Sequence, residues 1–132
     1  MIQYNRGGAM IVEWSIVILV VAFICLDIIT GLLKAVYEKN LESECIRKGL
    51  IHKIGEILAV AVAFLIEYSQ TVILSINFDI PIVKGVCIYI ILMEILSVLE
   101  NICVINPQLR KVFSPYLKKL REKENEIESK GN

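Results

Sequence analysis

Three long apolar stretches dominate the pattern of hydrophobic and polar positions along this chain. They run over Trp14–Leu33, Ile54–Ile76 and Ile82–Ile105, and few charged residues interrupt them. A helix needs about 20 such residues to cross the hydrocarbon core of a bilayer. A single soluble core could not cover three helices that are apolar on nearly all sides. The pattern therefore predicts an all-α integral membrane protein with three transmembrane helices.

The polar segments between and around these stretches divide the chain into parts. We expect a short extracytoplasmic leader over residues 1–13, a transmembrane domain over 14–105 and a charged cytoplasmic tail over 106–132. Asn106-Pro107 is a favourable helix stop after the third stretch. The three spans are expected at about 14–36, 54–76 and 82–105.

The positive charges predict the orientation of these spans. Lys and Arg together number 14, as do Asp and Glu, so the formal net charge is zero. Five of the basic residues lie in the connector over residues 34–53 and seven lie in the tail. Short segments rich in Lys and Arg stay cytoplasmic. Three spans place both basic segments on the cytoplasmic side, with the amino end outside and the tail inside. The expected basic anchors are Arg47, Lys48, Lys53, Arg110, Lys111, Lys118, Lys119 and Arg121.

Composition excludes several classes of function. Apolar residues make up 56% of the chain and charged residues 21%, whereas soluble domains have about half and a quarter. The four cysteines have no short paired spacing and His52 is the one histidine, so neither a metal site nor a disulfide framework is supported. No nucleophile–base set or phosphate-binding loop is visible. We therefore expect no catalytic residues, cofactor or nucleic acid, and membrane lipids and further copies of the chain as partners.

Polar side chains within the apolar stretches are the candidate functional residues. A charge at the centre of a membrane helix costs about 2.5–3.5 kcal/mol, so such groups normally face a bundle interior or a water-filled cavity. Two arrangements remain open: the acids line or pack beside the lumen of an oligomer, or they pair within one monomer, with hydrogen bonds or with Lys34 or Lys53. The expected residues of this polar interior are Asp27, Thr30, Lys34, Glu56, Glu67, Glu94, Ser97 and Asn101.

Small residues at helical spacing predict where helices pack together. Gly31 and Ala35 are four positions apart in the first stretch, and Gly55, Ala59 and Ala63 form a ladder in the second. Small residues let helix backbones approach closely in lipid, where no hydrophobic force drives association. These five positions are therefore expected to mediate helix packing, within one chain or between copies.

The order of these polar residues resembles that of a known family. The run Asp27-Ile-Ile-Thr30-Gly31-Leu-Leu-Lys34-Ala35, then Arg47-Lys48-Gly49-Leu50 and Ser97-Val-Leu-Glu100-Asn101, is similar to the toxin-secretion/phage-lysis holins over about residues 14 to 121. Cys45 departs from the pattern, where a serine or glycine turn is expected. The resemblance implies a small protein of the cytoplasmic membrane of Gram-positive bacteria or their phages. It would oligomerise into a lesion through which a peptidoglycan hydrolase, or in some loci a large toxin, escapes.

Two other classes of function remain open at this point. One is a small ion-coupled transporter subunit in which a membrane glutamate exchanges protons, although aromatic residues make up only 8% of the chain. The other is a membrane adaptor whose tail recruits a cytoplasmic partner.

The amino end also suggests a second translation start. The codons for Arg6-Gly7-Gly8 can contain a ribosome-binding sequence just upstream of Met10. Translation from Met10 would remove Arg6, a positive charge that slows insertion of the first helix.

Overall fold

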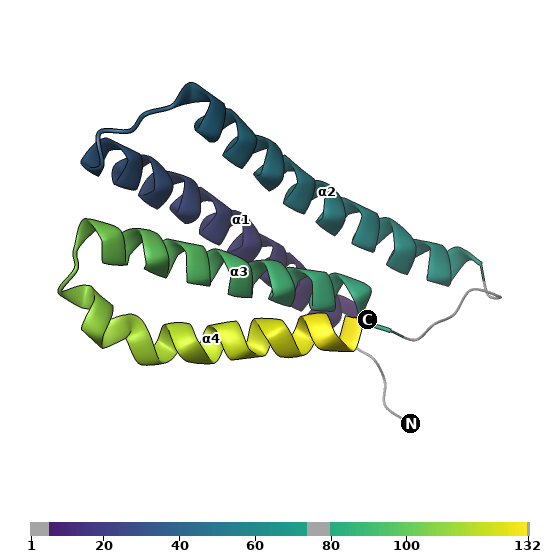
Figure 1. Cartoon of the computed structure of the whole chain (residues 1–132). Coiled ribbons are helices and arrows are strands. Elements are labelled where there is room, and N and C mark those ends of the chain that lie inside the picture. The colour runs from purple at the N-terminus through teal and green to yellow at the C-terminus, as the bar shows by residue number, and fades with distance from the viewer. Residues whose placement is uncertain (1–5, 74–79, 132) are drawn as a thin grey trace.

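The computed structural model describes residues 6–73 and 80–131, with side chains from residue 14 onward, and these residues form four helices and no strand. Figure 1 shows the helices as a bundle in which α3 lies beside each of the other three. The fold is therefore all-α, as predicted. The helices are α1 (Arg6–Tyr37), α2 (Ser43–Val72), α3 (Ile82–Ile105) and α4 (Leu109–Gly131).

Three of the helices are long and apolar enough to cross a membrane. The candidate spans are Trp14–Tyr37, Ser43–Val72 and Ile82–Ile105, which confirms the prediction of three transmembrane helices. Large apolar side chains such as Ile18 on α1 and Leu65 on α2 point outward, with exposed fractions of 65% and 67%. A soluble protein rarely exposes so continuous an apolar surface. These outer sides of α1 and α2 are suited to contact lipid.

The buried core joins α3 to α1 and α2. Its side chains are small or β-branched, which allows the three helices to lie close together. In the first half of α3, Cys87 is fully buried and Ile90 nearly so. The core residues are Val20, Ile24, Val60, Ala63, Val83, Cys87 and Ile90.

The second helix begins earlier than the hydrophobic pattern predicts. We expected a span from about residue 54, but α2 begins at Ser43. The basic residues before position 54 are good helix formers, and Glu44 and Lys48 form an i,i+4 ion pair of 3.2 Å. The turn from α1 is therefore short, and Lys39, with φ of 54°, takes the left-handed conformation that ends many helices. The predicted end of this span, over residues 74–76, lies outside the described residues.

The third helix and the first differ in how closely they follow the sequence pattern. α3 has the predicted bounds, because Pro81 precedes it and Asn106-Pro107 follows it. α1 begins at Arg6, so much of the expected leader is helical. Residues 1–5 lie outside the described part of the chain. Translation from Met10 stays a prediction.

Helix α4 turns back and runs antiparallel to α3, so its last residue lies near the start of α3 (Figure 1). Its only helix neighbour in the described part of the chain is α3. Pro115 lies inside α4, and a proline removes one backbone hydrogen bond and bends a helix. The bend is visible near the first turns of α4 (Figure 1).

Candidate functional site: a buried charged cluster

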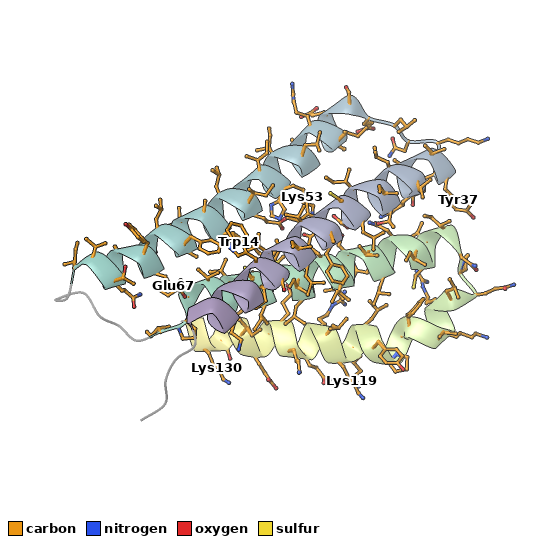
Figure 2. All side chains as sticks on the ribbon, turned by 180° about the vertical axis from the view of Figure 1, so that it is seen from behind. Trp14, Tyr37, Lys53, Glu67, Lys119 and Lys130 are labelled. Atoms are coloured by element: carbon orange, nitrogen blue, oxygen red, sulfur yellow. The ribbon has the colours of Figure 1, made fainter. Side chains whose placement is uncertain are left out.

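A lysine lies among three carboxylates where α1, α2 and α3 meet. Lys53 projects from α2 toward α1 and α3 (Figure 2). Its Nζ lies 2.8 Å from Asp27 Oδ2, donates a hydrogen bond to Glu94 Oε1, and lies 3.7 Å from Glu56 Oε2. The four side chains are between 2% and 12% exposed. We call Asp27, Lys53, Glu56 and Glu94 the charged cluster.

Polar neighbours extend the cluster toward the end of α3. Asn101 Nδ2 donates to Asp27 Oδ1 and to Thr30 Oγ1, both at 3.2 Å. The Thr30 hydroxyl donates in turn to the backbone carbonyl of Asp27 at 3.2 Å. Gly31 lies beside this contact, since a Cβ on it would stand 3.7 Å from Asn101 Nδ2. Gly31 thus lies where α1 meets α3, at the level of the hydrogen bonds, and the space there would also admit a methyl group.

The cluster contains more acid than base. Three carboxylates surround one ammonium group, and His52 Nε2 lies 3.2 Å from Glu56 Oε1 at the exposed edge. Among the described residues, Glu56 Oε2 and Glu94 Oε2 are buried without a hydrogen-bond partner. Burying an unpaired charge is costly. The packed cluster therefore holds more carboxylate oxygens than the donors of Lys53, His52 and Asn101 satisfy.

Two grooves flank α2 and reach the cluster from different sides. One, of about 260 Å³, lies between α1 and α2 and includes Asp27 and Lys53 in its lining. The other, of about 610 Å³, lies between α2 and α3 and includes Glu56. Gly31 and Ala35 line the first groove, whereas Gly55 and Ala59 line the second. The small residues thus border openings beside the charged cluster.

The structure brings together five of the eight predicted polar residues, namely Asp27, Thr30, Glu56, Glu94 and Asn101. Glu67 is separate: its Oε1 accepts the backbone N–H of Val83 at 2.9 Å, at the start of α3. Among the described residues, Lys34 and Ser97 make none of the cluster's contacts. The contacts seen are those of the monomer arrangement, which the sequence left open beside the lumen arrangement.

The sequence did not show which of the basic anchors, or which residues of the ladder Gly55, Ala59 and Ala63, are buried in the bundle. The sequence placed Lys53 both among the basic anchors, with Arg47 and Lys48, and among the possible partners of the membrane acids. Its side chain points into the bundle, whereas those of Arg47 and Lys48 are exposed. Of the ladder, Ala63 is buried whereas Gly55 and Ala59 are exposed. A Cβ on Gly55 would meet nothing within 4 Å. The ladder is thus only partly used within one chain.

Sequence reasoning missed several contacts that hold the helices. His52 and Glu56 are four residues apart, a spacing that could have predicted their pair. No local pattern indicated that Arg121 would pair with Glu100, or that the Tyr89 hydroxyl would donate to Glu128 Oε1 at 3.2 Å. Within the described ranges, no three His, Cys, Asp or Glu residues are placed to hold a metal ion.

Comparison with known proteins adds one match. The model of the bacteriophage holin family matches residues 7–122, which is most of the chain and includes all of the charged cluster. No curated protein and no solved structure matches.

Proposed function

Since this chain belongs to the bacteriophage holin family, we propose that its lesion lets a peptidoglycan hydrolase or a large toxin leave the cell. The chain is a multi-pass protein of the cytoplasmic membrane, and its function is of the holin type, a non-enzymatic membrane lesion that leads to lysis. The identity of the released protein, a peptidoglycan hydrolase or a large toxin, is the part of this function that we propose. A folded enzyme needs an opening much wider than an ion pathway, so several copies must assemble around it.

The observation that carries this proposal is the match of the family model over three membrane-length helices. The outer sides of α1 and α2 are apolar, and two of the acids that would oppose insertion, Asp27 and Glu94, pair with Lys53 inside the bundle. A chain of this kind can accumulate in lipid before it assembles. Copies then associate without first needing a soluble partner.

The orientation that we propose follows from the basic residues. Arg47 and Lys48, at the start of α2, and Arg110 and Lys111, at the start of α4, are exposed. These two helix starts belong on the cytoplasmic side. The amino end is then outside, and the segment over residues 106–132 begins in the cytoplasm.

The experiment that tests this function is induction of the chain in bacteria that contain a cytosolic reporter enzyme and a separately expressed peptidoglycan hydrolase. We expect abrupt growth arrest after a delay, release of the reporter, and lysis only where the hydrolase is present. Cells with the hydrolase alone are the control. Efflux of small cations that depends on an ion gradient, without loss of the reporter, would instead indicate a transporter. Membrane accumulation with neither result would indicate an adaptor.

A further inference from the structure

Helix α4 is highly charged and yet lies along a membrane-length helix. Eleven of its 23 residues are Lys, Arg or Glu. Its less exposed positions recur every three or four residues and form one side of the helix, the side toward α3, which is its only neighbour among the described helices. These positions are Leu109, Phe113, Leu117, Leu120 and Glu124.

Two polar contacts fix how far α4 extends along α3. Arg121 pairs with Glu100, near the end of α3. The Tyr89 hydroxyl donates to Glu128 Oε1 at 3.2 Å, near the start of α3. A helix of this length extends for about 35 Å, comparable with the hydrocarbon core of about 30 Å. Because α3 crosses the membrane, the second half of α4 lies at membrane depth.

The outer side of α4 cannot face lipid at this depth. Lys119 and Lys130 point away from the bundle (Figure 2), and most of the other charged residues of α4 are exposed. Charged side chains within a membrane face a bundle interior or water. The outer sides of α1 and α2, by contrast, carry apolar residues. One side of the molecule thus suits lipid, and the α4 side needs water.

We propose that, in the assembled lesion, α4 lies inside the water-filled lumen, packed on α3, with the α4 helices of successive copies facing the same water. The proposal rests on the proposed function, since only an assembly can enclose that water. The lumen is continuous with the cytoplasm, so α4 stays in an aqueous phase. The charged cluster then holds α1, α2 and α3 together on the side of α3 away from the lumen, because Lys53 pairs with Asp27 and Glu94.

The charge sequence of α4 predicts a gradient along this lumen. The first half of α4, over residues 109–120 beside the end of α3, carries four basic residues and no acid, whereas the second half, over residues 121–131 beside the start of α3, carries four glutamates and three basic residues. In the proposed orientation the cytoplasmic mouth is basic and the outer mouth has mixed charge with a small acidic excess. The first set is Arg110, Lys111, Lys118 and Lys119, and the second is Arg121, Lys123 and Lys130 with Glu122, Glu124, Glu126 and Glu128.

Crosslinking tests the depth of α4. Cys25, Cys45, Cys87 and Cys103 are first replaced with alanine. Tyr89→Cys and Glu128→Cys are then introduced together, and a short bifunctional thiol reagent is applied to membranes collected at the onset of lysis. We expect a crosslink within one chain, at a yield within two-fold of the matched control pair. That control joins Trp14→Cys to Phe64→Cys, whose native rings have centroids 6.3 Å apart on α1 and α2.

Reactivity with a charged thiol reagent tests whether α4 lies in water. We expect Lys119→Cys, on the outer side of α4, to react at least ten-fold faster than Leu65→Cys, on the apolar outer side of α2. The proposal is overturned if the control pair crosslinks and the α4 pair does not, or if both outer-side cysteines react equally slowly. Neither result touches the proposed function, which fails instead if the cysteine-free chain accumulates in membranes without causing lysis.

Discussion

At the scale of single residues, Lys53 is the side chain on which the packing of the three spans depends most. It is the one lysine in the described part of the chain that contacts carboxylates of both α1 and α3, through Asp27 and Glu94. Removing one partner of a buried pair leaves the other charge uncompensated, which costs more than the pair contributes. The cluster therefore makes the packed bundle sensitive to this one position.

Replacing Lys53 with methionine keeps an unbranched side chain, one atom shorter than that of lysine, but removes its charge. We expect Lys53→Met to lower the free energy of unfolding in detergent by about 3 kcal/mol, measured by thermal or denaturant unfolding. The matched control is Lys48→Met, whose ion pair with Glu44 is exposed and contributes about 0–1 kcal/mol. Equal losses in the two variants would contradict a structural role for the cluster.

Asn101 tests the hydrogen-bonded extension of the same cluster. We expect Asn101→Ala to cost about 1 kcal/mol, the size measured for side-chain hydrogen bonds between membrane helices, because Asp27 and Thr30 both lose a donor. Unfolding in detergent measures the change, with Asn125→Ala on the exposed side of α4 as control. If Asn101→Ala unfolds like the parent chain, the hydrogen bonds do not stabilise the α1–α3 contact.

At the scale of elements, the start of α3 is held by a side chain of α2. The first backbone N–H groups of a helix have no partner within it, and Glu67 Oε1 accepts that of Val83. The contact also joins the far end of α2 to α3. Within a single chain, the contact of Glu67 with the Val83 N–H thus requires an acceptor oxygen at residue 67 but no negative charge.

This role predicts a difference between two substitutions of Glu67. Glutamine keeps an acceptor oxygen, so we expect Glu67→Gln to leave lysis timing and oligomer size unchanged. Leucine removes the acceptor, and we expect Glu67→Leu to cost about 1 kcal/mol, seen as faster hydrogen exchange at the first amides of α3. A large change in lysis timing with Glu67→Gln would favour the lumen position for this residue that the sequence also allowed.

At the scale of the whole molecule, the groove between α2 and α3 is open where small residues border it. Gly55, Ala59 and Gly85 line this groove, and a Cβ on either glycine would meet nothing within 4 Å. The packing of one chain therefore leaves these positions unused. Gly55, Ala59 and Gly85 are therefore available to pack against another copy of the chain.

Filling this groove should weaken assembly without unfolding the monomer. We expect Ala59→Leu to lower the crosslinked oligomer fraction about ten-fold, which corresponds to about 1.4 kcal/mol, and to delay lysis, while unfolding in detergent is unchanged. Val62→Leu is the matched control, since Val62 is exposed on the same helix outside the groove. If both variants assemble like the parent chain, copies associate through another surface.

The sequence predicted the elements better than their ends and contacts. The bounds of α3 followed from the prolines on either side of it, which act locally. Helix α2 begins at Ser43, ahead of the membrane span predicted from about residue 54, because hydropathy reports membrane residence and the first turns of α2 are helical but polar. The five polar residues of the charged cluster and its extension were all recognised as candidates, and Lys53 was one of two lysines named as a partner for the acids. The particular pairs that join different helices, such as Lys53 with Glu94 and Asn101 with Asp27, were not predicted.

Sequence alone determined that this chain is all-helical, that three of its helices suit a bilayer, and which polar residues had to be shielded from lipid. Those properties depend on local composition and on the free energy of moving each side chain from water to hydrocarbon. Only the tertiary structure decided that Lys53 turns inward to Asp27 and Glu94, and that α4 folds back along α3. Such contacts depend on the relative rotation and height of separate helices, which no periodicity within one helix can specify.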